Sequence, residues 1–262
     1  MKKEESRFVT TDLFEGMTSL RAVLYAMENG IGDRRLKRVI VDRDRVKSRA
    51  RELAWLGHKS REFGFTIEHE DSAVIDDMSV GNSHGGILFE CTARSIPTVE
   101  EAGDSVLSDD GFWVMLEGIE DPYNFGYALR TLYSCGVDGV VLSPRNWMSA
   151  AGVVCRSSAG ASEMLPLLVS ESGDPTELFK GHGYRIVCAG IRDSVSSFDA
   201  ELEKPLLLIV GGEKRGISRN LLDKADLIVR IDYGREFGGS LSAASAASIL
   251  GYEVLRQNRE RK

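Results

Sequence analysis

The chain has 262 residues, which is enough for one large domain or two ordinary ones. Its residues are 42% hydrophobic and 28% charged, as in soluble globular proteins, and no apolar run reaches the roughly 18 residues of a membrane-spanning helix. The net charge of −7 argues weakly against a nucleic-acid partner, and without a hydrophobic signal region the protein is expected in the cytoplasm.

The first 97 residues are predicted to form a small α/β domain. Apolar residues recur there at helical spacing in two segments, with short β-type runs beside them. The expected elements are helices at 17–27 and 45–63 and strands at 36–41, 65–68 and 88–91. Residues 98–110, which include several acids, are predicted to be an exposed linker.

Residues 111–262 are predicted to form a larger α/β domain in which strands and helices alternate. The strands are short continuous runs rich in Val, Ile and Leu, a pattern typical of a parallel sheet covered on both faces. The last helix begins with small residues, which suit close packing against a ligand loop or a partner subunit. The expected strands lie at 112–116, 139–142, 184–189, 206–210 and 227–231, and the expected helices at 125–135 and 242–258.

Positive charge is concentrated in the second predicted helix and the segment before it. Between Arg34 and Arg61 the sequence holds eleven Lys and Arg against three Asp and Glu, a local net charge of +8. A basic patch on an acidic protein can still bind phosphates. A run of this kind is also often a solvated helix face, and from the residues alone that interpretation is favoured.

The four cysteines lie far apart in the sequence, at positions 91, 135, 155 and 188, and form no CxxC motif. This spacing argues against a disulfide framework, and no metal site is expected. We predict that the four cysteines are reduced and buried as small apolar side chains.

The segment 116–130 carries the first of three candidate site motifs. A turn after a predicted strand leads to a helix that begins with Asn124 and Gly126 and carries Arg130. In open α/β sheets, ligands bind where the strands end at their carboxyl edge. The alternative is an Asn that caps the helix and an Arg exposed on its surface.

The second motif directly follows the predicted strand at 206–210. It is a glycine-rich loop over residues 211–216 with one carboxylate, Glu213. Its backbone groups could bind a flat polar ligand such as adenine. The loop lacks the spacing of a dinucleotide fingerprint or a P-loop, so binding of nucleotide phosphates is disfavoured. A tight turn capped by Glu213 is the alternative.

The third motif lies between the strand at 227–231 and the last helix. Two glycines precede Ser240, Leu241 and Ser242, so a glycine-rich loop ends in hydroxyl side chains at a helix start. A helix N-cap at Ser240 or Ser242 is the alternative explanation.

In their order and spacing, the three motifs closely resemble those of the SpoU/TrmH branch of the SPOUT RNA methyltransferases. The matching residues are Asp121, Pro122, Asn124, Gly126 and Arg130 in the first motif, Gly211, Glu213 and Gly216 in the second, and Ser240 and Leu241 in the third. The resemblance covers about residues 110–258. More loosely, residues 1–97 resemble the ribosomal-protein-L30-like (L30e-like) substrate-binding domain of such enzymes, through the order of their elements and the turn at 84–87.

The resemblance implies a C-terminal α/β knot, a parallel sheet threaded into a trefoil, although knots are very rare among proteins. It implies a homodimer, with S-adenosylmethionine as the cofactor that supplies a methyl group to a ribose 2′-hydroxyl of rRNA or tRNA. The residues that it implies for cofactor binding, largely through backbone groups, are Gly190, Gly211, Gly212, Gly216, Ile231, Ser240, Leu241 and Ser242.

Catalysis is implied to depend on Arg130, with Asn124 and Glu213 shaping the site. An Arg pKa of roughly 12 or more makes deprotonation of the guanidinium costly. We therefore expect Arg130 to activate the 2′-hydroxyl electrostatically and to anchor an RNA phosphate, and the 2′-hydroxyl would explain a choice of RNA over DNA. Under this hypothesis the +8 segment becomes the expected RNA-binding surface, with contacts at Arg45, Arg49 and Lys59.

One position departs from the family pattern, because Ser242 stands where the third motif has Asn. Serine lacks the paired donor and acceptor of the amide. A non-catalytic RNA-binding protein on the same scaffold is therefore the second hypothesis. A third, a Rossmann-type small-molecule enzyme, is disfavoured because the glycine-rich loops come late in the chain and no early GxGxxG is present.

Overall fold

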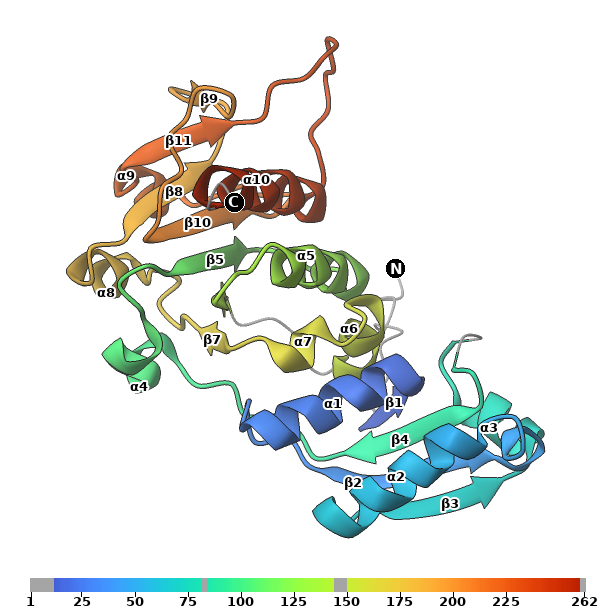
Figure 1. The fold of residues 1–262 in the computed structure, drawn as a ribbon. Coiled ribbons are helices and arrows are strands. Elements are labelled where there is room, and N and C mark those ends of the chain that lie inside the picture. Colours follow the sequence, from blue (N-terminus) through green and yellow to red (C-terminus); the bar gives the residue numbers. More distant parts are fainter. Residues whose placement is uncertain (1–11, 82–83, 144–149, 260–262) are drawn as a thin grey trace, which may run out of the picture. The chain divides into compact units, whose positions relative to one another are not determined.

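The computed structural model describes residues 12–81, 84–143 and 150–259 (Figure 1). By their contacts the residues divide into two compact units, one of Met1–Ser95 with Ser149–Met164 and one of Ile96–Met148 with Leu165–Lys262. The sequence prediction assigns the segment 149–164 to the second domain, whereas its contacts group it with the first unit.

The first unit is built on a four-stranded sheet in the order β1-β4-β2-β3. β4 pairs antiparallel with β1 and β2, and β2 pairs parallel with β3. The elements from the N-terminal part of the chain are β1 (Leu13–Glu15), α1 (Met17–Asn29), β2 (Leu36–Asp42), η1 (Arg43–Arg45), α2 (Ala50–Phe63), β3 (Thr66–Glu70), α3 (Ser72–Met78) and β4 (Ile87–Cys91).

One predicted helix of this unit begins later than expected. The helix predicted from residue 45 begins only at Ala50, and a 3₁₀ turn occupies Arg43–Arg45. The carboxylate of Asp42 accepts a hydrogen bond from the backbone N–H of Asp44 at 2.9 Å and so stabilises the shorter turn. The prediction of a continuous helix from residue 45 was therefore wrong at its start.

Two short helices from the middle of the chain complete the first unit, α6 (Ala151–Ser157) and α7 (Ala161–Met164). Cys155 on α6 belongs to the same buried cluster as Phe14 and Leu20. On α7, the carboxylate of Glu163 accepts a hydrogen bond from Arg34 Nε at 2.8 Å, and both side chains are buried. The segment thus contributes both apolar contacts and a buried ion pair.

The second unit is built on a seven-stranded sheet in the order β7-β6-β5-β10-β8-β11-β9, and all pairings between these strands are parallel. The predicted α/β fold with a parallel sheet is confirmed, while the knot stays a prediction. The strands are β5 (Phe112–Glu117), β6 (Gly139–Leu142), β7 (Leu167–Val169), β8 (Arg185–Ala189), β9 (Val195–Ser196), β10 (Leu206–Gly211) and β11 (Leu227–Arg230).

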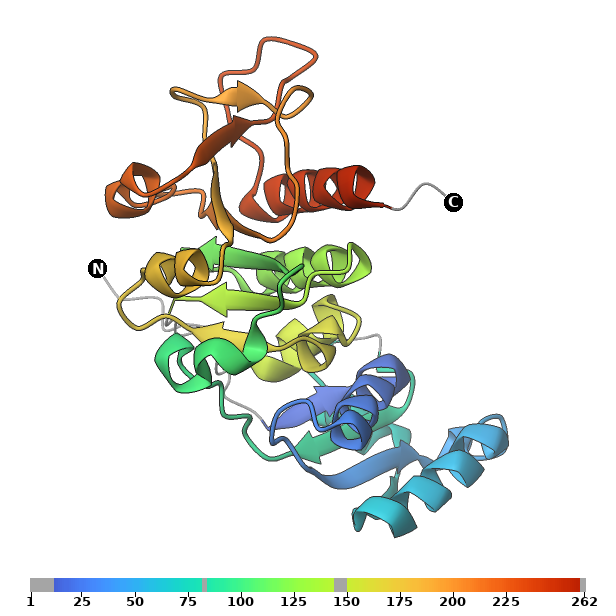
Figure 2. The ribbon, with the colours of Figure 1, turned by 60° about the vertical axis from the view of Figure 1, so that its left-hand side comes forward.

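Helices cover both faces of this sheet (Figures 1 and 2). On one face Trp113 and Ile209 form a buried cluster with Phe179 of α8 and Leu221 of α9, and on the other α5 and α10 pack against each other. The segment predicted as a linker contains α4 and η2. The helical elements are α4 (Val99–Ala102), η2 (Gly103–Val106), α5 (Pro122–Ser134), α8 (Thr176–Gly181), α9 (Arg219–Asp223) and α10 (Ala243–Asn258).

The order of the strands reverses between β5 and β10. From β5 the sheet continues through β6 to β7 on one side, whereas β10, β8, β11 and β9 lie on the other side. Such a reversal opens a crevice at the carboxyl ends of the two central strands, which is the usual ligand position in open α/β sheets. Candidate sites are therefore expected at this edge.

All four cysteines are free and buried, as predicted. Burial raises the pKa of the Cys91 and Cys188 thiols to about 12. Within residues 12–81, 84–143 and 150–259, no three or more His, Cys, Asp or Glu side chains gather as metal ligands would. In the same ranges, none of the helices has the length and apolar character needed to cross a membrane.

Candidate active site

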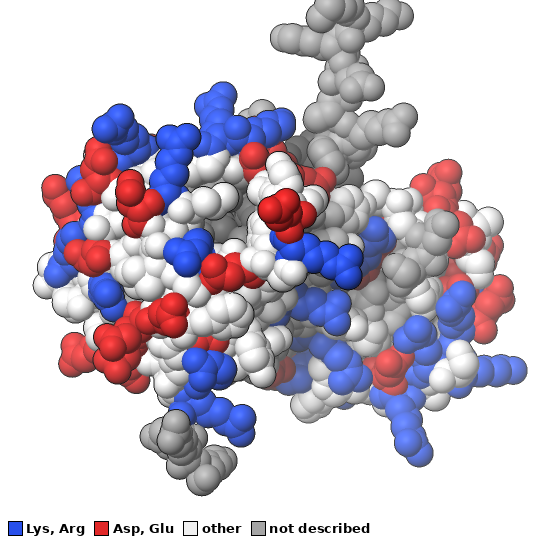
Figure 3. Space-filling view, turned by 90° about the horizontal axis from the view of Figure 1, so that it is seen from above, with Lys and Arg blue, Asp and Glu red and all other residues white. Residues whose placement is uncertain are grey.

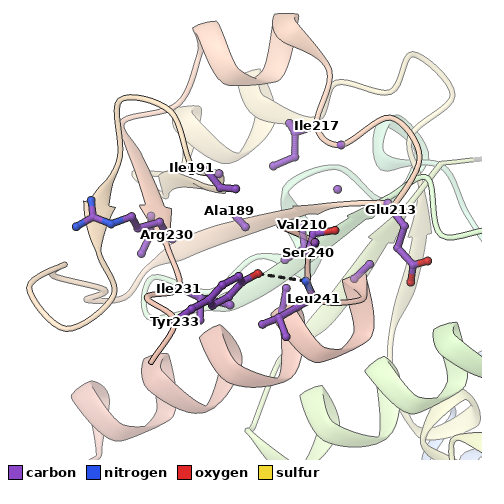
Figure 4. Close-up of a pocket in the computed structure, with 18 of the residues that line it drawn as sticks. Ala189, Ile191, Val210, Glu213, Ile217, Arg230, Ile231, Tyr233, Ser240 and Leu241 are labelled. Atoms are coloured by element: carbon purple, nitrogen blue, oxygen red, sulfur yellow. Dashed lines mark hydrogen bonds between the residues drawn. The ribbon is translucent and has the colours of Figure 1, made fainter. Parts of the chain in front are cut away.

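A pocket of about 530 Å³ lies at the carboxyl ends of β8, β10 and β11, among the loops that follow them (Figure 4). We call it the glycine-loop pocket. Its wall combines apolar side chains, among them Ile191, Val210 and Ile217, with backbone of the glycine-rich segments. Of the eight residues predicted to bind the cofactor, seven line this pocket: Gly190, Gly211, Gly212, Gly216, Ile231, Ser240 and Leu241.

The second motif forms a tight loop in which two positions, 211 and 212, have no room for a side chain. A Cβ atom on Gly211 would lie 2.3 Å from the carbonyl carbon of Gly216, and one on Gly212 would lie 2.2 Å from the carbonyl oxygen of Gly118. The loop closes with a hydrogen bond of 2.9 Å from the N–H of Gly216 to the carbonyl of Gly212. The glycines therefore bring backbone, not side chains, to the pocket wall.

The third motif ends a long loop that extends away from the sheet between β11 and α10 (Figures 1 and 2). At its base, the hydroxyl oxygen of Tyr233 accepts a hydrogen bond of 3.2 Å from the backbone N–H of Leu241 (Figure 4). The ring of Phe237 lies 6.0 Å from that of Tyr233 and is 62% exposed. Two aromatic rings thus line the pocket beside the residues of the motif.

A polar network fixes the loop between β8 and β9 to the end of β11. The guanidinium of Arg230 donates to Asp232 Oδ1 at 2.9 Å and to the carbonyl of Ser194 at 2.6 Å. The hydroxyl of Ser196 donates to the other carboxylate oxygen of Asp232. These bonds, the one from Ser196 first, lower the pKa of Asp232 below its ordinary value. Asp232 is therefore a carboxylate at neutral pH at the edge of the pocket.

Ser242 is the eighth residue predicted to bind the cofactor, and it is not among the residues that line the pocket. It is the N-cap of α10, where its hydroxyl oxygen accepts a hydrogen bond of 3.1 Å from the backbone N–H of Ser245. Ser and Asn are about equally good N-caps. Serine in place of the motif's Asn therefore still caps the start of α10.

The three residues predicted to act in catalysis lie in different places. Glu213 lines the glycine-loop pocket, with its side chain directed away from the labelled apolar residues (Figure 4). Asn124 and Arg130 are on α5 and do not line this pocket. Asp121, not Asn124, caps α5, by accepting a hydrogen bond of 2.8 Å from the N–H of Asn124. Arg130 is exposed, and its guanidinium has no hydrogen-bond or ion-pair partner among the described residues.

The cations predicted to contact RNA through the first unit all have carboxylate partners. Arg45 Nε lies 3.2 Å from Asp42, and a guanidinium nitrogen of Arg49 lies 2.5 Å from Glu52. The ammonium of Lys59 lies 2.7 Å from both Glu28 and Glu62, which raise the pKa of the lysine. Their charges are therefore largely compensated locally.

Other cations of the +8 segment are exposed and lack a carboxylate partner among the described residues. They are Arg35, whose guanidinium donates only to the backbone carbonyl of Arg34, and Lys47, Arg51 and Arg61. Arg51 and Arg61 are ten residues apart on α2, which puts them about 80° apart around the helix axis. Figure 3 shows one face of the molecule, where Lys and Arg are interspersed with Asp and Glu. Pairing, and not the number of cations, decides which charges are available to a phosphate.

Several residues of the pocket were not identified from the sequence. Tyr233 and Phe237 lie in the loop before the third motif, and Ile191 follows Gly190. Tyr233 and Phe237 could have been identified, because two aromatic residues in a glycine-rich loop are candidates for a ligand pocket. Arg230 and Asp232 carried no such signal, because their roles depend on the distant Ser194 and Ser196.

Residues 111–252 match the model of the SpoU rRNA Methylase family. A protein of Bacillus subtilis (strain 168), assigned to the TrmH family of tRNA/rRNA methyltransferases, is 27% identical over 230 residues, which are 86% of this chain and 90% of that protein. The family model spans all three motifs. The match to this relative covers more residues than the second unit holds, so it also includes part of the first unit.

Solved structures show the same fold. The AdoMet-bound rRNA methyltransferase from Sinorhizobium meliloti superposes with a TM-score of 0.75 at 20% identity, covering 95% of this chain and 88% of that one. A structure described as an RNA 2′-O ribose methyltransferase superposes with a TM-score of 0.72 at 22% identity, covering 94% and 88%. With the family model matched over more than half of its length, this chain belongs to the SpoU rRNA methylase family.

Proposed function

We propose that this protein transfers the methyl group of S-adenosylmethionine to a ribose 2′-hydroxyl in RNA. The observation that carries the proposal is the convergence of the second and third motifs on one pocket at the carboxyl edge of the sheet. Family membership supports the methyl transfer and the RNA substrate. The solved structure described as an RNA 2′-O ribose methyltransferase, which shares the fold, supports the 2′-hydroxyl as the acceptor.

The chemistry of the glycine-loop pocket fits the cofactor. Its volume of about 530 Å³ is within the range of small-molecule sites. Apolar side chains such as Ile191 and Ile231 suit a flat adenine ring, and the backbone groups at 211–216 and 239–241 can satisfy the polar atoms of an adenine and a ribose. When bound, S-adenosylmethionine supplies an activated methyl group on a sulfonium. Seven of the eight residues predicted to bind it line this pocket. The eighth, Ser242, caps the start of α10.

The protein must then position a weakly acidic 2′-hydroxyl in line with the methyl group. Arg130 remains a guanidinium at neutral pH, so it can lower the cost of a developing alkoxide and bind an RNA phosphate without accepting a proton. Its lack of a described carboxylate partner leaves this charge available. Asn124 and Glu213 are proposed to shape the surroundings of the hydroxyl.

We propose that the first unit, the expected ribosomal-protein-L30-like domain, binds the RNA around the modified nucleotide. The exposed Lys47, Arg51 and Arg61 supply positive charge that no described carboxylate compensates. Arg45, Arg49 and Lys59 add charge only if they exchange their carboxylates for phosphates. These ion pairs are partly buried, with the side chain of Asp42 4% and that of Lys59 16% exposed, so the exchange costs more than it would for exposed pairs. Ribosomal RNA is the substrate we favour, and tRNA is the alternative.

We propose that the protein acts as a homodimer formed through α5 and α10. These helices pack on each other and expose four large side chains, Tyr127 and Tyr133 on α5 and Ile249 and Tyr252 on α10. Large exposed side chains on adjoining helices are typical of an interface. Arg130 is also exposed on α5, one turn from both Tyr127 and Tyr133. A second copy of the protein that packs on these two tyrosines would therefore lie close to Arg130.

The alternative of a non-catalytic RNA-binding protein was motivated by Ser242. Because Ser242 caps α10 as an Asn would, the observation gives that alternative less support. A transfer assay separates the two. We would incubate the purified protein with S-adenosylmethionine labelled in its methyl group and total RNA from cells that lack the gene, then digest the RNA to nucleosides. Label in 2′-O-methylated nucleosides is expected. Label in base-methylated nucleosides, or none at all, would contradict the proposal.

A further inference from the structure

A second cavity, of about 390 Å³, lies beside the glycine-loop pocket. It is found at the carboxyl ends of β5 and β10, the two strands between which the strand order reverses. We call it the β5–β10 cavity. Glu117, Gly118 and Glu120 line it from the β5 side, and the loop of the second motif with Ser218 lines it from the β10 side. None of the three motifs predicted it as a separate site.

The two cavities share a wall. Gly212 and Gly216 line both of them, and a Cβ atom on Gly216 would meet nothing within 4 Å. Only a loop without side chains at these positions thus separates the two spaces. A methyl transfer needs two ligands whose reacting atoms come within about 3 to 3.5 Å of each other. Because the cavities adjoin at Gly212 and Gly216, ligands in the two spaces can meet past the edge of this loop, where neither residue places a side chain between them.

The β5–β10 cavity is lined by two carboxylates and two cations. The carboxylate of Glu117 accepts a hydrogen bond of 2.9 Å from the backbone N–H of Ser218, and Lys214 forms an ion pair of 2.5 Å with Glu120. Arg215 is exposed and has neither a hydrogen bond nor an ion pair with any residue the structure describes. After these pairings, the carboxylate of Glu117 and the guanidinium of Arg215 are the two charges left for a ligand.

We propose that the β5–β10 cavity receives the acceptor ribonucleotide and that Arg215 binds one of its phosphates. The proposal rests on the proposed RNA methyl transfer and adds the position of the acceptor. A ribonucleotide fits the polar lining, since its ribose and base offer donors and acceptors to Glu117 and to the backbone around Gly118. The arginine fork matches a phosphodiester in shape and charge. The ion pair between Lys214 and Glu120 joins the two sides of the cavity.

The test compares two arginines of the same segment. Arg215→Ala removes the free cation of the cavity, and Arg219→Ala removes another exposed cation at the start of α9, which pairs with Asp223 and lines neither cavity. In the transfer assay, Arg215→Ala is expected to raise the RNA concentration at half-saturation about tenfold and to leave S-adenosylmethionine affinity within twofold of the wild type. Arg219→Ala is expected to change neither. Equal behaviour of the two variants would overturn the assignment of Arg215.

A second variant fills the cavity. The hydroxyl of Ser218 makes no side-chain cap hydrogen bond, so Ser218→Tyr places a ring in the cavity without removing one. It is expected to lower methyl transfer at least tenfold while S-adenosylmethionine still binds in calorimetry. Transfer at the wild-type rate would overturn the site.

Photo-crosslinking separates failure of this site from failure of the proposed function. Total RNA containing 4-thiouridine is irradiated with the full-length protein, and the crosslinked peptides are identified by mass spectrometry. Crosslinks within 117–120 or 212–218 that Ser218→Tyr removes are expected, whether or not a methyl group is transferred. Crosslinks confined to other segments would overturn the cavity as an RNA site, even if the methyl transfer itself is observed.

Discussion

The hydroxyl oxygen of Tyr233 accepts a hydrogen bond of 3.2 Å from the backbone N–H of Leu241, across the loop that carries the third motif (Figure 4). Both residues line the glycine-loop pocket. The bond therefore joins the start and the end of a long loop at its base, next to the predicted cofactor residues Ser240 and Leu241. Tyr233 is in this sense a positioning residue for the pocket.

Tyr233→Phe should weaken S-adenosylmethionine binding about two- to twelvefold, because the loop loses one hydrogen bond, worth roughly 0.5 to 1.5 kcal/mol, and keeps its ring. Calorimetric titration measures the change. Tyr25→Phe on α1 is the control, since Tyr25 is 44% exposed and its hydroxyl has no partner among the described residues. Unchanged or tighter binding by Tyr233→Phe would show that the bond does not hold the pocket.

Arg130→Ala should abolish methyl transfer and leave S-adenosylmethionine affinity nearly intact, because Arg130 does not line the glycine-loop pocket. Arg130→Lys keeps the charge but not the fork and should retain a small part of the rate. Single-turnover kinetics with saturating cofactor measure the effect. A turnover of Arg130→Ala equal to the wild type would remove this residue from the mechanism.

Two triple variants test which cations of the first unit bind RNA. Substituting Lys47, Arg51 and Arg61 by Ala should weaken RNA binding and flatten the dependence of log K on log salt by about two to three units, because these charges lack described carboxylate partners. Substituting Arg45, Arg49 and Lys59 should have a smaller effect, since each is already paired. A larger effect of the second triple would contradict this account of the surface.

Ser242 is predicted to act through the helix cap. Ser242→Ala should lower the free energy of unfolding by about 1 kcal/mol, because the N–H of Ser245 loses its acceptor, whereas Ser242→Asn should change it by only a few tenths. Urea unfolding followed by circular dichroism gives both values. If Asn destabilised the protein as much as Ala, the capping role would be excluded.

Breaking the buried ion pair between Arg34 and Glu163 tests whether the segment 149–164 stabilises the first unit. Glu163→Gln leaves the guanidinium of Arg34 buried without its counter-charge and should cost about 3 kcal/mol of unfolding free energy. Asp223→Asn, which breaks the exposed pair with Arg219, should cost less than about 0.5 kcal/mol. Equal losses in the two variants would argue against a buried, stabilising pair.

Much of the second unit could be predicted from the sequence because its signals are local. Apolar runs such as 139–142 and 206–210 predict buried parallel strands without knowledge of their neighbours. The glycines at 211 and 212 were found because a close approach of backbone leaves no room for a side chain, and the structure shows that approach.

The features that the sequence did not reveal depend on residues far apart. Glu163 pairs with Arg34 across 129 positions, so no local pattern assigns α7 to the first unit. Lys59 looked available to RNA until Glu28 from α1 was found beside it. The hydrogen bond of Tyr233 and the β5–β10 cavity likewise arise only when separate segments meet at one edge of the sheet.

Calorimetric titration of the full-length protein with S-adenosylmethionine tests the central claim most directly, because the proposed reaction needs the cofactor in the glycine-loop pocket. We predict one binding site per chain with a dissociation constant in the micromolar range, a free energy of about −8 kcal/mol at 1 μM. S-adenosylhomocysteine should compete for the same site. No detectable binding with millimolar S-adenosylmethionine would contradict the account and favour a non-catalytic RNA-binding protein.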